Sequence, residues 1–163
     1  PYIHGAVGAP RASFVGLGSE SGKPHLLRAL FEGVVFAHRA HILTIADVTG
    51  HRPQAARLSG GAARSAVWAQ MFADVLNMEI EVAEGSELGT LGGAICAAVA
   101  TGRYDGFEAA TAAMTRVGRR FHPNPSAAIV YQAKHAAFCR VNEALNAVWP
   151  QFGDGARLDK QSS

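Results

Sequence analysis

A strand, a pair of glycines and a helix follow one another in the middle of this chain, and this order limits the folds that it can adopt. Residues 55–59 have the pattern of a short strand, Gly60 and Gly61 form a turn, and Ser65 can cap a helix with an apolar inner face. Residues 79–83 alternate polar and apolar side chains, as a strand with one solvated face does. Strands that alternate with helices indicate an α/β layer.

Helices dominate the rest of the chain. The longest predicted helix runs from about Pro24 to Ala46, and Leu30 lies in the middle of an apolar stripe that we expect to be buried. Three further helices are predicted, at residues 88–100, 107–117 and 126–149. Two or three strands make a poor sheet by themselves. We therefore expect a helix-rich, incomplete domain that is a piece of a longer chain.

The composition favours one packed domain over a nucleic-acid-binding or membrane protein. Of the 163 residues, 48% are hydrophobic and 17% are charged, which is enough apolar material for one core. The formal net charge is +2 and the basic residues are scattered, so no nucleic-acid partner is expected. No stretch approaches the roughly 18 consecutive apolar residues of a membrane span. Cys96 and Cys139 lie in apolar helical stretches, so we expect buried free thiols and a cytoplasmic location.

The turn at Gly60 and Gly61 is the sharpest local candidate for a binding site. Glycines between a strand and a helix allow backbone N–H groups to approach a phosphate closely, and a nucleotide phosphate is the natural ligand. The turn contains neither the lysine of a Walker loop nor the third glycine of a dinucleotide fingerprint. Taken alone, such a glycine pair is more often ordinary turn chemistry. The local pattern leaves both interpretations open.

Other polar residues indicate structural roles. The seven histidines contain no paired-ligand motif, so no metal site is predicted. Arg28 and Glu32 are four residues apart on the long helix and can form an intrahelical ion pair. Asp74 follows the inner face of its helix, where we expect it to hold local structure. No acidic residue lies in a pattern typical of a general base.

Two motifs resemble the FGGY family of carbohydrate kinases when they are taken together. The segment from Ala12 to Glu32 covers 21 positions and is similar to the family's second signature, with Ala-Ser-Phe-Val-Gly-Leu at its start and His-Leu-Leu-Arg-Ala-Leu-Phe-Glu at its end. Downstream, Ser-Gly-Gly-Ala-Ala-Arg-Ser at residues 59–65 resembles the family's adenine-nucleotide motif. The amino-acid sequence around His25 to His41 and Trp68 to Asp74 is most similar to that of the pentulose kinases, which include L-xylulose kinase and xylulokinase. The likeness covers residues 1–149.

The resemblance implies a two-domain enzyme of the actin-like, ribonuclease-H-like ATPase fold, with sugar and ATP in the cleft between the domains. Residues 1–149 would be most of the second, nucleotide-side domain, and residues 150–163 would be a polar tail. ATP and Mg²⁺ are the implied cofactors, and a sugar and the N-terminal kinase domain are the implied partners. A homodimer is left open.

Residue by residue, the resemblance implies nucleotide contacts at Gly61 and Ser65, while Gly60 and Ala62 complete the turn. Some relatives have Asn at the position of Ser65. The family's catalytic aspartate, its sugar-binding residues and its Gly-Thr phosphate loop precede the matched region. The resemblance therefore implies no catalytic residue in this chain.

The implied reaction is transfer of the γ-phosphoryl group of Mg-ATP to a hydroxyl of a ketopentose or a related sugar. One alternative is a catalytically inactive, kinase-like domain that serves interaction or oligomerisation, and the intact glycine turn argues weakly against it. The other alternative is an actin-like ATPase that acts on no sugar. The signature from Ala12 to Glu32 argues against this second alternative, because such relatives lack it.

Overall fold

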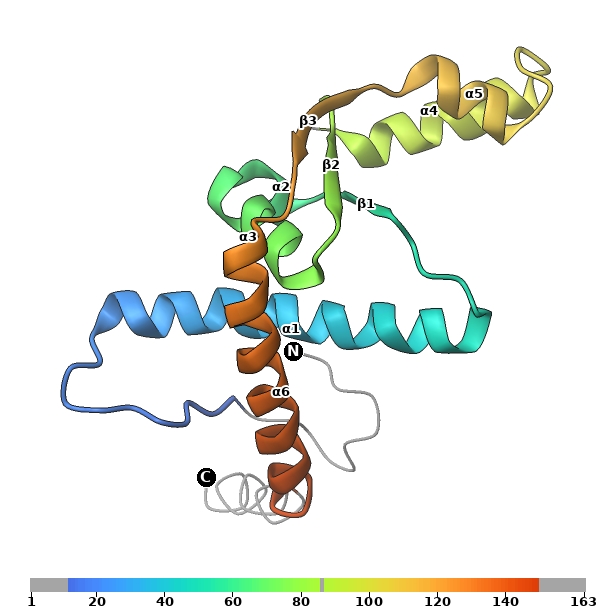
Figure 1. Ribbon diagram of the computed structural model, residues 1–163. Helices are drawn as coiled ribbons and strands as arrows, with labels where there is room; N and C mark the ends of the chain where they lie inside the picture. The colour runs from blue at the N-terminus through green and yellow to red at the C-terminus, as the bar shows by residue number, and fades with distance from the viewer. Residues whose placement is uncertain (1–11, 86, 150–163) are drawn as a thin grey trace, which may run out of the picture. The chain divides into compact units, whose positions relative to one another are not determined.

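The computed structural model describes residues 12–85 and 87–149 (Figure 1). The predicted polar tail at residues 150–163 lies outside the described residues. The elements in chain order are α1 (Lys23–Thr49), β1 (Ala55–Leu58), α2 (Gly61–Arg64), α3 (Ala66–Leu76), β2 (Glu79–Ala83), α4 (Leu88–Ala100), α5 (Phe107–Met114), β3 (Val117–Phe121) and α6 (Pro125–Asn146). The described residues divide into two compact units, the first with residues 12–51 and 126–149 and the second with residues 52–85 and 87–125.

The second unit is built on a three-stranded sheet in the order β1-β2-β3. β1 pairs with β2 in parallel, and β3 pairs with β2 in antiparallel. Ile80 and Val82 of β2 are buried on one face, and Val82 belongs to a core cluster with Ala63 of α2 and Ala69 of α3. Leu58 and Phe121 pack against this cluster from the two outer strands.

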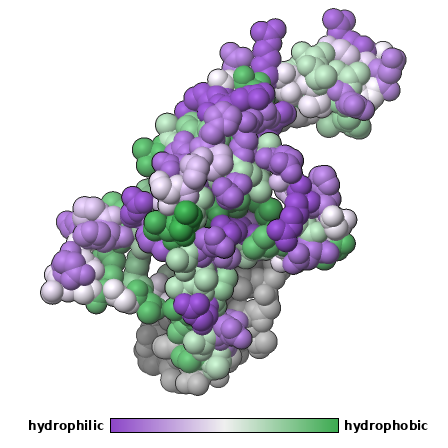
Figure 2. All heavy atoms as spheres, in the orientation of Figure 1, coloured by the Kyte–Doolittle hydropathy of each residue, from purple (hydrophilic) through white to green (hydrophobic). Residues whose placement is uncertain are grey.

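The opposite face of this sheet carries linked ion pairs. Glu81 of β2 pairs with Arg57 of β1 and with Arg120 of β3, at 3.0 Å in both cases. Arg120 also reaches Glu79 at 3.2 Å, and Glu79 pairs with His122 at 3.2 Å. Figure 2 shows hydrophilic residues gathered where Figure 1 places β2 and β3. One face of the sheet is therefore apolar and covered, and the other is polar.

The sequence predicts β2 with the bounds that the structure has, and β1 to within one residue. The sequence predicts no element at residues 118–121, and the helix that it predicts at residues 107–117 ends in the structure at Met114, so that Val117 begins β3. The strand sequence Val-Gly-Arg-Arg-Phe contains a glycine, which weakens the interior of a strand. Its strand conformation depends on pairing with β2, which a local pattern does not reveal.

In the first unit, α1 and α6 meet through aromatic and charged side chains. The Phe36 ring of α1 lies 6.3 Å from that of Tyr131, 5.7 Å from that of His135 and 5.3 Å from that of Phe138, measured between centroids. The predicted pair of Arg28 and Glu32 is confirmed, with 2.8 Å between Nε and Oε1. Two residues of α6 contact this pair: Lys134 Nζ donates to Glu32 at 3.0 Å, and the Tyr131 hydroxyl accepts from Arg28 at 2.8 Å.

The predicted burial of Leu30 is wrong. Leu30 is 50% exposed, and Leu27 and Phe31 beside it are 57% and 43% exposed. The residues of α1 that are buried are Glu32, Val35, Phe36, Ala37 and Ala46. An apolar stripe predicts which face of a helix packs against other parts of a protein. Whether that face is buried depends on which other elements are present.

α1 is long and apolar enough to cross a membrane, with a mean hydropathy of 1.2 over 18 residues. It is the one such helix among the described residues. A core helix of a soluble protein passes the same test. α1 also carries the ion pair between Arg28 and Glu32. The expected lack of a membrane partner stays a prediction.

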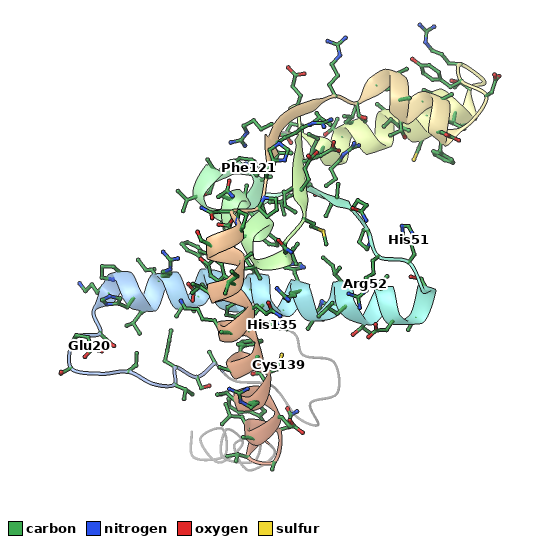
Figure 3. All side chains as sticks on the ribbon, in the orientation of Figure 1. Glu20, His51, Arg52, Phe121, His135 and Cys139 are labelled. Atoms are coloured by element: carbon green, nitrogen blue, oxygen red, sulfur yellow. The ribbon has the colours of Figure 1, made fainter. Side chains whose placement is uncertain are left out.

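Both cysteines are free, as expected, but they are exposed and not buried. Cys139 lies one turn after His135 on α6 (Figure 3), and its sulfur is 3.7 Å from Nε2 of that imidazole. Burial lowers the pKa of His135, and the nearby Arg39 cation lowers it further. The apolar stretches that suggested burial of the thiols form helices with one uncovered side. The cytoplasmic location stays a prediction.

Candidate functional site

The glycine turn follows β1 directly and leaves open space beside its backbone. Gly60 has φ +77° and ψ −156°, a conformation that is essentially restricted to glycine. Gly61 begins α2 and has no positive φ. A Cβ added at either residue would have no other atom within 4 Å. The positive φ therefore belongs to Gly60, and both glycines leave room for a ligand.

Two helices follow the turn where the sequence predicts one. Gly61–Arg64 forms the single turn of α2, and Ser65 then adopts an extended conformation, with φ −94° and ψ 114°. The hydroxyl of Ser65 accepts a hydrogen bond from the backbone N–H of Trp68 at 3.2 Å, which caps α3 as predicted. A hydroxyl that accepts one bond can still donate its proton. Its predicted contact with a nucleotide stays a prediction.

A cavity of about 490 Å³ lies beside the turn. Its walls come from the turn, from the ends of β2 and β3 that meet there, and from the start of α4, all within the second unit. The lining residues are Gly60, Ala63, Arg64, Val82, Ala83, Glu84, Gly85, Leu88, Gly118 and Arg119. Of the four predicted nucleotide-binding residues, Gly60 lines the cavity, whereas Gly61, Ala62 and Ser65 belong to the same segment without lining it.

The cavity lies at the carboxyl ends of the two parallel strands. β1 ends at Leu58, two residues before Gly60, and β2 ends at Ala83, next to Glu84. In open α/β sheets, ligands bind outside the carboxyl ends of the strands. The location of the cavity is therefore the one expected of a ligand site in this class of fold.

Two arginines give the cavity its positive charge. Arg64 ends α2 and Arg119 lies on β3, and one carboxylate, that of Glu84, is also in the lining. Within residues 12–85 and 87–149, neither arginine pairs with a carboxylate. Arginine is well suited to phosphate because its guanidinium presents several N–H donors in one plane. The charge and the open backbone together suit an anionic ligand such as a nucleotide.

The sequence gives no signal for the part that Arg119 has in this site. Its guanidinium donates a hydrogen bond to the carbonyl oxygen of Ala63, 56 residues earlier in the chain. It also lies over the ring of Phe121, 5.7 Å from the ring centroid. β3 itself was not predicted, so neither contact could be anticipated.

Asp74 holds local structure, as expected from its place on the helix. Its side chain is buried and accepts hydrogen bonds from Gln70 Nε2 at 2.9 Å and from the backbone N–H of Asn124 at 2.8 Å. The contact with Gln70 lies within α3, and the contact with Asn124 connects α3 with the segment after β3. The described part of the chain holds no group of three or more His, Cys, Asp or Glu residues that could hold a metal ion. The expected lack of a metal site in this chain stays a prediction.

The sequence model of the FGGY family of carbohydrate kinases, C-terminal domain, matches residues 5–101. Because this match covers more than half of the chain, the chain belongs to the FGGY family of carbohydrate kinases. The family that the motifs at residues 12–32 and 59–65 predict is thus confirmed.

Known proteins of this family align with nearly the whole chain. The L-xylulose/3-keto-L-gulonate kinase of Escherichia coli K12 is 34% identical over 151 residues, which cover 89% of this chain and 29% of that protein. The gluconokinase of Bacillus subtilis is 31% identical over 149 residues, covering 90% of this chain and 28% of that protein. The chain therefore spans less than a third of the length of these relatives.

A solved structure supports the same assignment. The ligand-bound xylulose kinase from Lactobacillus acidophilus superimposes with a TM-score of 0.77 at 27% identity, over 88% of this chain and 29% of the other. The predicted fold class is confirmed: a helix-rich part of the C-terminal domain of an FGGY kinase, which has the actin-like ATPase fold.

Proposed function

We propose that this chain forms the nucleotide side of a sugar kinase that transfers the γ-phosphoryl group of ATP to a sugar hydroxyl. The observation that carries the proposal is the cavity at the carboxyl ends of β1 and β2, which begins at Gly60 and contains Arg64 and Arg119. Phosphoryl transfer requires positioning of the two reactants and stabilisation of charge on the phosphoryl oxygens. The open backbone at the turn can position ATP, and the positive charge of the cavity wall favours its phosphates.

Within this site we assign nucleotide contacts to Gly61 and Ser65, and the shape of the turn to Gly60 and Ala62. Support comes from the geometry, because Gly61 has open space around its Cα and Ser65 is exposed with a hydroxyl proton left to donate. Mg²⁺ accompanies ATP in this proposal and takes oxygen ligands. The described residues contain no cluster of acidic side chains for it, so we assign no residue of this chain to the metal.

We propose a ketopentose or a related sugar as the acceptor. The E. coli relative, named as an L-xylulose/3-keto-L-gulonate kinase, supports a keto sugar. The B. subtilis relative, named as a gluconokinase, favours gluconate as a second candidate at nearly the same identity. A panel that contains both L-xylulose and gluconate separates the two.

We propose that the rest of a full-length kinase supplies the sugar site and the catalytic base, and covers the apolar face of α1. Leu27, Leu30 and Phe31 are about half exposed on that face. The relatives are more than three times as long as the segment that aligns with this chain, which leaves ample protein to cover it. A second copy of the chain is the alternative occupant, and the mass of the full-length protein in solution separates these two possibilities.

The test is Gly61→Val in the full-length kinase, with ADP release measured against ATP and against the sugar. We expect KM for ATP to rise about tenfold or more, equivalent to about 1.4 kcal/mol of binding energy, and KM for the sugar to change little. Gly61 has no positive φ and no atom near its added Cβ, so the variant should fold. A matched melting temperature checks this.

Three results would contradict the proposal. If the variant raises KM for the sugar alone, the turn does not serve ATP. If ATP is hydrolysed at the same rate without any sugar, the protein is an actin-like ATPase. If the full-length protein binds ATP but turns over no sugar in the panel, the inactive, kinase-like module is the better description.

A further inference from the structure

Arg119 connects β3 to the glycine turn through one carbonyl group. We propose that Arg119 is a positioning residue: it holds the carbonyl of Ala63 and so fixes the segment Gly60–Ala63 in the conformation that the nucleotide needs. This inference rests on the proposed nucleotide site and adds to it a residue outside the glycine motif. It is derived from three features of the second unit.

The first feature is the hydrogen bonding of Ala63. Its carbonyl accepts from a terminal nitrogen of Arg119, and its N–H donates to the carbonyl of Gly60 at 3.2 Å. The last carbonyls of a helix have no partner within the helix, and α2 is only one turn long. The carbonyl of Ala62 accepts from the N–H of Ser65 at 3.3 Å. Arg119 thus satisfies the next carbonyl and links it, through Ala63, to the first residue of the turn.

The second feature is the way in which the guanidinium is held. It lies over the ring of Phe121, and Phe121 packs against the core cluster that contains Ala63. Residues two apart on a strand share one face, so Phe121 and Arg119 both lie on the side of the sheet that carries α2. Among the described residues no carboxylate neutralises Arg119. Its charge is therefore retained at the cavity wall.

The third feature is a bulge in β3. Arg119 is opposite Val82 and Val117 is opposite Ala83, so Gly118 is an extra residue on β3. A Cβ at Gly118 would lie 3.3 Å from the Cα of Glu84, which is closer than nine in ten such contacts. β-bulges redirect a side chain and are common next to active sites. The bulge lets β3 approach the end of β2 at the cavity, with Arg119 as the next residue.

The experiment compares Arg119→Met with Arg120→Met in the full-length kinase. Methionine keeps the apolar length of the side chain over Phe121 and removes the charge and the donors. Arg120 is the matched control, because it is the next residue on β3 and pairs with Glu79 and Glu81 on the other face of the sheet. The measurements are KM for ATP, KM for the sugar, kcat, inhibition by ADP and by adenosine, and the melting temperature.

We expect Arg119→Met to raise KM for ATP about tenfold, with KM for the sugar within about twofold of the wild type. Inhibition by ADP and by adenosine should weaken together, because the whole turn is displaced. Arg119→Lys should recover part of the loss, since an ammonium group can donate to the Ala63 carbonyl but lacks the planar guanidinium. Arg120→Met should leave KM for ATP within about twofold of the wild type.

Two results would overturn the inference. If ADP inhibition weakens and adenosine inhibition does not, Arg119 contacts phosphate directly and is not a positioning residue. If Arg119→Met lowers the melting temperature and leaves KM for ATP unchanged, its role is purely structural. In either case a raised KM for ATP in Gly61→Val would leave the proposed nucleotide site intact. If neither Gly61→Val nor Arg119→Met affects ATP, the proposed site fails with the inference.

Discussion

Gly60→Ala and Gly61→Ala are expected to change the stability of the protein in opposite directions, although the two glycines are adjacent. Gly60 has φ +77° and ψ −156°, where a side chain costs about 1–3 kcal/mol of backbone strain. No atom lies within 4 Å of a Cβ built there, so the strain has no steric clash added to it. Gly61 is helical, where alanine is favoured over glycine by about 0.5–1 kcal/mol.

The predicted difference between the two variants is therefore about 1.5–4 kcal/mol in the free energy of unfolding. Urea melts measure it directly, and thermal melts should show a shift of about 2–4 °C per kcal/mol for a domain of this size. Equal destabilisation by both substitutions would refute the reasoning. So would a Gly60→Ala variant within about 0.5 kcal/mol of the wild type, which is the size of an ordinary surface effect.

Three other predictions concern the first unit and the chain as a whole. In urea melts of the 163-residue chain, Phe36→Ala should lower the free energy of unfolding by about 3–5 kcal/mol, because Phe36 is 5% exposed. Leu30→Ala should lower it by about 1 kcal/mol or less, because Leu30 is 50% exposed. Similar losses in the two variants would contradict the described burial. Burial lowers the pKa of His135, so the unfolded chain binds a proton that the folded chain resists, and stability should fall as the pH drops below about 6.5. His135→Gln should flatten that part of the curve of stability against pH, and an unchanged curve would exclude His135 as its cause. The 163-residue chain alone should release no ADP in the presence of pentuloses, and turnover near 1 s⁻¹ would contradict the assignment to the nucleotide side.

Local chemistry made several features of the fold predictable. The alternation of residues 79–83 gave β2, and the hydroxyl of Ser65 marked the start of α3. The spacing of Arg28 and Glu32 gave their ion pair. Each of these features is set by residues within about one helical turn or one short strand, which is the range that periodicity and capping report.

Features that depend on distant partners were missed. β3 forms because β2 pairs with it, and its own sequence resembles a loop. The hydrogen bond from Arg119 joins residues that are 56 positions apart in the sequence. The sequence therefore predicts the glycine turn of the candidate site but not the side of the cavity that β3 forms. The exposure of Leu30 depends on what lies against α1, which the spacing of apolar residues along one helix does not specify.

The two consecutive arginines of β3 create an ambiguity during folding. If β3 slipped by one residue against β2, Arg119 could take the ion pairs that Arg120 makes, so charge alone discriminates poorly between the two alignments. Such a slip would turn Phe121 from the core toward water and would move Gly118 away from Glu84, where a Cβ would lie 3.3 Å from the Glu84 Cα. The correct alignment of β3 is therefore selected by the packing of the Phe121 ring in the core and by the absence of a side chain at Gly118. The ion pairs of Arg120 form as a consequence of this alignment.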